Sequence, residues 1–122
     1  MQPFSQTIIV LEQQSAAFLG SGTLPVFATP AMIALMENTA MQAMSSLLKP
    51  DECSVGIEIN AKHLKASLIG AAVTCTATLS RQEGRMLDFD IVATDKAGDV
   101  IGTATHRRCI VQASRFMAKL AQ

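Results

Sequence analysis

One stretch, Thr29 to Lys49, limits most strongly what this chain can fold into. It reads TPAMIALMENTAMQAMSSLLK, about five turns of strong helix formers rich in Ala, Met and Leu. Thr29 is a good N-cap, and Pro30 suits the first helical position. Pro50 ends the segment, because the residue before a proline disfavours helical dihedrals. The sequence therefore predicts one long helix over residues 29–49.

Glu37 stands out within this helix. At about 100° per residue, it lies inside the apolar face, between Ile33 and Met41. The polar side chains share the opposite arc of the helix: Thr39, Asn38, Gln42, Ser45 and Ser46. A carboxylate on an apolar face is costly to bury without a partner or a proton. Glu37 is therefore a candidate functional group, and the alternative is a glutamate at the end of an interface that reaches water.

Size and composition exclude several classes of protein. The 122 residues fit one domain spanning 1–122, and the balance of 10 basic and 10 acidic residues shows no nucleic-acid or membrane-surface footprint. No apolar run approaches the roughly 18 residues of a membrane span, and residues 1–10 lack a basic region and a cleavage site. The three cysteines have no metal-ligand spacing, so we expect no metal and a reducing, cytoplasmic compartment.

Flanking segments complete an α+β pattern. A strand is predicted over 6–11 and a helical turn over 14–19, before the long helix. After Pro50 the period changes from helical to alternating, which predicts strands over 54–63, 71–80, 87–94 and 100–112, turns over 81–85 and 95–99, and a helix over 113–121. A mostly apolar helix followed by one-sided strands indicates a sheet wrapped around the helix, a hot-dog fold. Such subunits typically pair, so we expect a homodimer, possibly a tetramer.

The strand faces place the remaining candidates. In 54–63 one face carries Val55, Ile57, Ile59, Ala61 and His63, so His63 ends an apolar face. In 71–80 the apolar face contains Cys75, a core residue, whereas both faces of 100–112 are mixed. A dyad of Cys109 with His106 is not expected, because residues three apart on a strand point to opposite faces.

Thr29 and His63 could act together with Glu37. A threonine at a helix N-terminus can meet a carbonyl or oxyanion, although plain capping explains it as well. A histidine on an apolar strand face is often only a core or rim residue. However, a buried carboxylate needs a proton or a cation nearby, and an inward histidine can supply one. Arg107 and Arg108 face opposite ways, and one of them could contact a carboxylate or phosphate, or end a solvated strand.

These residues resemble the fluoroacetyl-CoA thioesterase family of hot-dog enzymes. The resemblance rests on VFATPAMIALMENTA, then His63 and Gly70, then VTCTATLSRQEGRMLDFDIVATD and IGTATHRR. It implies a catalytic set of Thr29, Glu37 and His63 that cleaves the thioester of a short acyl-CoA. It also implies substrate contacts by Arg108 and Gly70, with coenzyme A as part of the substrate and no other cofactor.

Two departures from the family pattern bear on the substrate. The segment between His63 and Gly70 lacks the family's proline, and Leu24 stands where an aromatic residue covers the fluoroacetyl pocket. The sequence therefore favours a general acyl-CoA thioesterase, in which Glu37 is a nucleophile or a general base. The alternatives are a hot-dog hydratase or dehydratase, and a non-catalytic acyl-CoA binder. In a homodimer, Glu37 and His63 can come from different subunits.

Overall fold

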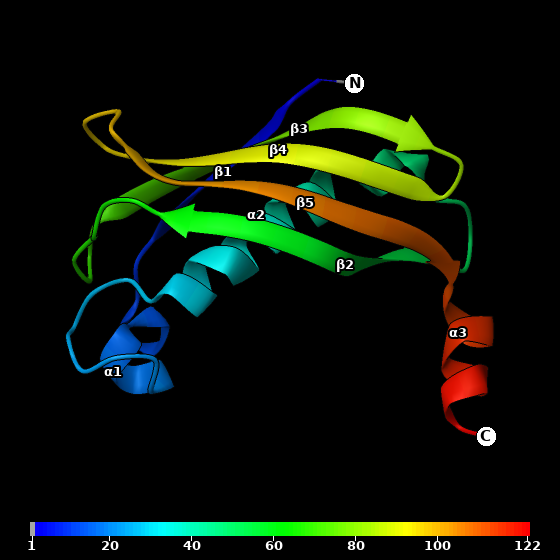
Figure 1. The fold of residues 1–122 in the computed structure, drawn as a ribbon, viewed down its shortest axis with the longest axis horizontal. Helices are drawn as coiled ribbons and strands as arrows, with labels where there is room; N and C mark the ends of the chain where they lie inside the picture. Colours follow the sequence, from blue (N-terminus) through cyan, green and yellow to red (C-terminus); the bar gives the residue numbers. More distant parts are fainter. Residues whose placement is uncertain (1) are drawn as a thin grey trace.

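The computed structural model describes residues 2–122, which form one antiparallel sheet of five strands and several helices. The strands are β1 (Phe4–Ile9), β2 (Glu52–His63), β3 (Ala72–Glu83), β4 (Met86–Asp95) and β5 (Val100–Gln112). Their order is β1-β3-β4-β5-β2, so β1 and β2 form the two edges of the sheet. Figure 1 shows this sheet curving over the long helix α2 (Thr29–Ala43), as the sequence predicts.

Helix α2 is shorter than predicted, and its N-cap lies one residue earlier. The α-helix ends at Ala43, and a short 3-10 helix, η2 (Ser45–Leu47), follows it. The Ser45 hydroxyl donates to the Gln42 carbonyl at 3.0 Å, a local bond that competes with the helical pattern. At the other end Ala28 is the N-cap, Thr29 is already helical, and no side chain caps the helix. The prediction that Thr29 is the cap is therefore wrong.

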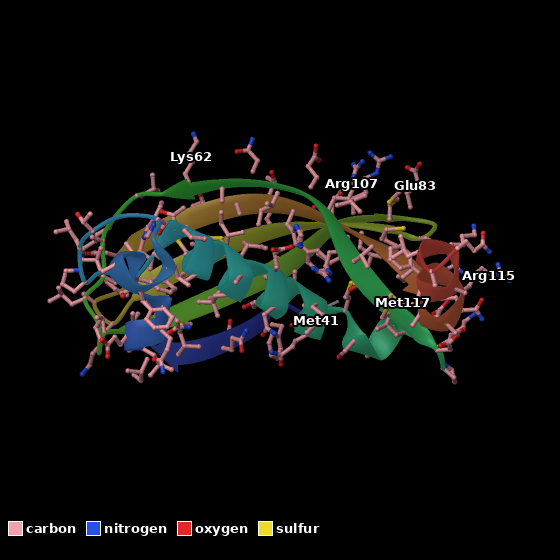
Figure 2. All side chains as sticks on the ribbon, turned by 90° about the horizontal axis from the view of Figure 1, so that it is seen from below. Met41, Lys62, Glu83, Arg107, Arg115 and Met117 are labelled. Atoms are coloured by element: carbon pink, nitrogen blue, oxygen red, sulfur yellow. The ribbon has the colours of Figure 1, made fainter. Side chains whose placement is uncertain are left out.

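The core lies between α2 and the inner face of the sheet. The alternation predicted for β3 and β4 is confirmed, with buried residues Val73, Cys75, Ala77, Leu87, Phe89, Ile91 and Ala93. On β5, where the pattern did not choose a face, His106 and Arg108 are buried, whereas Arg107 is exposed. Figure 2 shows Arg107 pointing away from α2. Strand β5 thus brings two polar side chains to the inner face, beside α2.

A bulge in β2 changes which of its side chains face inward. Gly56 pairs with Arg108 and Glu58 pairs with Arg107, so Ile57 is an extra residue between them. Beyond the bulge His63 and its alternate neighbours Ile59 and Ala61 remain partly buried, as predicted. Ile57 is 49% exposed, so its predicted place on the inner face is wrong. A bulge of this kind shifts the alternation by one residue, which a simple period-2 pattern does not contain.

The remaining helices are short. They are η1 (Glu12–Gln14), α1 (Ala16–Leu19) and α3 (Ala113–Leu120), close to the turns and helix predicted at these places. In Figure 1, α1 lies near the N-terminal end of α2, and α3 extends from the end of β5. Among residues 2–122, no helix has the length and apolar character that crossing a membrane requires.

Candidate active site

Thr29 and His63 meet at the N-terminal end of α2. The Thr29 Oγ1 atom lies 2.8 Å from His63 Nδ1, a hydrogen-bond distance. The two residues line a cavity of about 310 Å³, together with residues from α1, the loop before α2 and the loop after β2: Ala16, Ser21, Val26, Phe27, Ala28, Leu64, Lys65 and Ala66. Because Thr29 does not cap its helix, its hydroxyl is available to the imidazole and to a bound carbonyl.

His63 is held in a mostly apolar setting. Its ring packs edge-on against Phe27, with centroids 6.3 Å apart, and its Nε2 atom is buried without a partner among the described residues. Burial lowers the pKa of His63, and a backbone hydrogen bond with Lys65 opposes this shift in part. A lowered pKa favours the neutral imidazole at neutral pH. The Lys65 ammonium binds Asp95 and Asp99, each at 2.7 Å, and so fixes the loop that follows His63.

Glu37 lies away from this pair within one chain. It is eight residues beyond Thr29 on the same helix, a rise of about 12 Å. Its neighbours along the helix surface, Ile33, Ala34 and Met41, leave an apolar flank partly open to solvent, and the Glu37 side chain is 41% exposed. Within residues 2–122 of a single chain, Glu37 and His63 therefore do not make the expected contact.

Arg108 and His106 are the groups that Glu37 faces instead. His106 Nε2 is 4.0 Å from Glu37 Oε2, and Arg108 Nη1 is 3.1 Å from the same Nε2. Arg108 is 6% exposed and donates from Nε to Ser54 Oγ at 2.8 Å and from Nη2 to the Ser54 carbonyl at 3.0 Å. Burial lowers the pKa of Arg108, and the charge of Glu37 opposes that shift. This cluster places an acid beside a buried cation.

Gly56 makes room for this cluster. A Cβ atom at Gly56 would lie 2.5 Å from Glu37 Oε2, 3.0 Å from His106 Cε1 and 3.3 Å from Arg108 Nη1. A contact of 2.5 Å is impossible without movement of the neighbouring group. A larger residue at this point of β2, on the inner side of the bulge, would therefore displace the Glu37 carboxylate.

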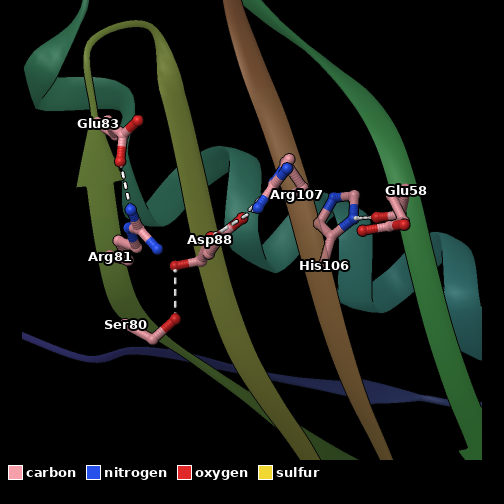
Figure 3. A network of polar contacts seen from close by, with 7 residues as sticks. All are labelled: Glu58, Ser80, Arg81, Glu83, Asp88, His106 and Arg107. Atoms are coloured by element: carbon pink, nitrogen blue, oxygen red, sulfur yellow. Dashed lines mark hydrogen bonds and ion pairs between the residues drawn. The ribbon is translucent and has the colours of Figure 1, made fainter.

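The structure places the other predicted residues differently. Gly70 lies in the turn before β3, with φ of 92°, and its N–H donates to the Val10 carbonyl at 2.8 Å. It does not line the Thr29 cavity, so a substrate contact by Gly70 stays a prediction. Of the two adjacent arginines, Arg107 binds Asp88 on the outer side of the sheet at 2.7 Å, as Figure 3 shows. The cysteine–histidine pair is separated as predicted: His106 is on the inner face and Cys109 on the other.

Sequence reasoning missed His106 as a member of the site. The sequence pattern excludes His106 as a partner of Cys109 and gives it no metal-ligand spacing with His63. The available signal was the spacing of two between His106 and Arg108, which puts both on one face of a strand. Within residues 2–122, no group of three or more His, Cys, Asp or Glu side chains is arranged to hold a metal ion.

Known proteins resemble this chain over nearly its whole length. The family described as fluoroacetyl-CoA-specific thioesterase matches residues 10–114. A fluoroacetyl-CoA thioesterase of Streptantibioticus cattleyicolor is 41% identical over 97 residues, which are 80% of this chain and 69% of that protein. A solved structure of a fluoroacetyl-CoA thioesterase variant in complex with acetyl-CoA is 33% identical, with a TM-score of 0.93 over 99% of this chain and 95% of that one.

A more distant structure supports the fold alone. A hot-dog-like protein from Thermanaerovibrio acidaminovorans is 20% identical, with a TM-score of 0.87 over 98% of this chain and 87% of that one. The hot-dog fold and the resemblance predicted from the sequence are confirmed by these similarities together.

Proposed function

Because this chain belongs to the fluoroacetyl-CoA-specific thioesterase family, we propose that it hydrolyses short acyl-CoA thioesters in a site completed by a second copy of itself. Thioester hydrolysis, predicted from the sequence, is the activity of the family. The coarser class, a thioester hydrolase, thus follows from membership, whereas the short acyl group and the shared site are proposals. Acetyl-CoA bound to a relative supports the size of the acyl group.

The hydrogen bond between Thr29 and His63 is the observation that carries the mechanism. In the Nδ1–H tautomer, His63 donates to Thr29 Oγ1, and the threonine O–H remains free to donate to a thioester oxygen. The N-terminus of α2 adds its positive dipole end at the same place. Together these groups stabilise the negative charge that develops on the carbonyl oxygen during attack.

A second copy supplies the carboxylate in our proposal. Glu37 cannot approach Thr29 of its own helix, because about 12 Å of rigid helix separates them. Strand β2 is an open edge of the sheet, and the flank of α2 beside Glu37 exposes Ala34 and Met41. An open edge next to an apolar flank supports pairing with another copy. A two-fold dimer would bring each Glu37 toward the other subunit's Thr29 and His63.

The reaction then needs one carboxylate and one water molecule. Glu37 either removes a proton from water that attacks the carbonyl carbon, or attacks that carbon itself to form an anhydride that water then opens. In both routes the C–S bond breaks, the thiol sulfur leaves with a proton, and the acid is released. His63 keeps Thr29 oriented, and its neutral ring can take up the proton that water loses and then give that proton to the departing thiolate.

Steady-state hydrolysis of an acyl-CoA panel tests this function. Thiol release from acetyl-, propionyl-, butyryl- and fluoroacetyl-CoA is measured for the wild type and for Glu37→Gln, His63→Ala and Thr29→Ala. Each substitution should lower kcat about 10²–10⁴-fold, the usual contribution of such groups. Glu12→Gln, an exposed glutamate on η1, is the matched control and should keep wild-type kcat.

Two outcomes would contradict the assignment. Wild-type kcat in both Glu37→Gln and His63→Ala would remove these residues from the mechanism. Conversion of an enoyl-CoA without thiol release would favour the hydratase alternative, and tight binding without turnover would favour the non-catalytic binder.

Two further parts of the proposal concern the chain as a whole. We propose a single domain over 1–122, which the one core between α2 and the sheet supports. A cytoplasmic location is supported by the free thiols of Cys53, Cys75 and Cys109.

A further inference from the structure

The hydrogen bonds of His106 fix both its charge and its tautomer. Its Nδ1 lies 2.8 Å from the Glu58 backbone oxygen, which can only accept, so Nδ1 carries the proton. Its Nε2 lies 3.1 Å from Arg108 Nη1, which can only donate, so Nε2 presents a lone pair. His106 is therefore a neutral ring that donates to one partner and accepts from the other. Figure 3 shows its bond to Glu58.

The setting of His106 favours the neutral state on balance. Burial lowers its pKa most, the bond to the Glu58 carbonyl opposes that shift, the charge of Arg108 adds to it, and the charge of Glu37 opposes it. The ring is 3% exposed, and the charged groups that face it are Arg108 and Glu37.

Arg108 keeps two N–H groups, one on Nη1 and one on Nη2, that have no acceptor among residues 2–122. Its Nε and Nη2 are held by Ser54, and its Nη1 is held by His106. Among residues 2–122, no Arg108 nitrogen lies within 4.0 Å of a Glu37 oxygen. Both groups nevertheless approach Gly56: a Cβ atom there would lie 2.5 Å from Glu37 Oε2 and 3.3 Å from Arg108 Nη1. A guanidinium and a carboxylate that can reach each other form a direct, strong pair unless other contacts hold them apart.

We propose that His106 is a positioning residue: its Nε2 holds one of the two Nη1–H groups of Arg108 and so fixes the guanidinium at a distance from the Glu37 carboxylate. The proposal rests on the proposed function, because Glu37 has to react for its freedom to matter. A carboxylate engaged by two guanidinium N–H groups is a weaker base and a weaker nucleophile than a free one. Arg108 then remains near enough to attract Glu37 without blocking its oxygens.

A matched pair of substitutions tests this role. His106→Phe keeps an aromatic ring but has no acceptor, whereas His106→Gln keeps an amide oxygen that Arg108 Nη1 can reach. We expect His106→Phe to lower kcat about 10- to 100-fold with KM within about 3-fold, and to move the acidic limb of the kcat–pH profile to lower pH. His106→Gln should keep kcat within about 5-fold and leave the limb in place.

A readout without substrate separates this inference from the proposed function. A crystal structure of free His106→Phe should show Arg108 Nη1 at about 2.8–3.0 Å from a Glu37 oxygen, and His106→Gln should not. If the wild type hydrolysed no thioester, the proposed function would fail, and this structural comparison would still decide the role of His106. If His106→Phe does not fold, His106→Leu, which also lacks an acceptor, replaces it.

Two results would overturn the proposal. One is an Arg108 that keeps its wild-type position in the variants without an acceptor. The other is an equal loss of kcat in His106→Phe and His106→Gln with an unmoved acidic limb, which is the signature of a merely structural side chain.

Discussion

At the scale of single residues, His63 and His106 link the active site to the stability of the folded protein at low pH. Burial is the main cause that lowers the pKa of each in the fold. An unfolded histidine takes up a proton near pH 6.5, whereas these two take it up only at lower pH when folded. The unfolded state therefore binds more protons, so their contribution to stability is complete above about pH 6.5 and is lost as pH falls below it.

Urea unfolding of the wild type should accordingly show a lower midpoint at pH 5.5 than at pH 7.5. His106→Gln removes one of the two titrating rings and should reduce this difference. Ion pairs lower the pKa values of the Asp88 and Asp95 carboxyl groups. These groups therefore stay charged between pH 5.5 and pH 7.5 and do not contribute to the difference. A midpoint equal at both pH values would contradict the burial argument.

The contacts of single residues were harder to predict than their positions on a helix or strand face. Thr29, Glu37 and His63 were chosen from their positions on a helix and a strand face, and Thr29 and His63 do meet. The contact between Thr29 and His63 was not predictable from local signals, since a threonine before Pro30 is typical of a cap. The outcome depends on where the end of β2 lies in space, which is a property of the whole sheet.

At the scale of elements, the bulge in β2 determines which residues lie beside the Glu37 carboxylate. It turns Gly56 inward beside Glu37 and Arg108, and leaves Ile57 outside. Gly56→Ala should displace the Glu37 carboxylate, because the added Cβ would lie 2.5 Å from its Oε2. We expect kcat to fall about 10-fold or more, since small misplacements of a reacting group are costly.

The melting temperature should change little in Gly56→Ala, because the Glu37 side chain is flexible and 41% exposed. Thiol-release kinetics and calorimetry measure the two effects. Gly84→Asn, in the turn between β3 and β4, is the control for a glycine outside the cluster, because an added Cβ there meets nothing within 4 Å and asparagine tolerates its positive φ. An unchanged kcat would show that the close approach at Gly56 has no part in catalysis.

Periodicity predicted the elements themselves well and their irregular points poorly. The range of β5 and the inner faces of β3 and β4 agree with the sequence pattern. The early end of α2 and the bulge at Ile57 do not. The 3-10 turn rests on local hydrogen bonds that the helical pattern does not contain, and the bulge depends on the pairing of β2 with β5. Both irregular points lie in the elements that carry Glu37 and His63.

At the scale of the whole molecule, the separation of Glu37 from His63 leads to a test of shared sites. Glu37→Gln and His63→Ala chains should each be nearly inactive alone. In a mixed dimer, the His63→Ala chain supplies a normal Glu37 and the Glu37→Gln chain supplies normal Thr29 and His63, so one of the two sites is intact. After denaturation and joint refolding at equal amounts, half of the dimers are mixed, and activity should recover to about a quarter of the wild type.

The mixing ratio gives this experiment its control. Activity should follow the product of the two chain fractions, with its maximum at equal amounts, and light scattering should give the mass of a dimer. Refolding the Glu37→Gln chain with the Thr29→Ala chain should also recover activity. Refolding His63→Ala with Thr29→Ala should not, because one subunit supplies both Thr29 and His63 to a site, so every site in the mixed dimer lacks one of them. Recovery in neither of the pairs that include Glu37→Gln would place all three residues in one subunit, which the geometry of α2 does not allow without rearrangement of that helix.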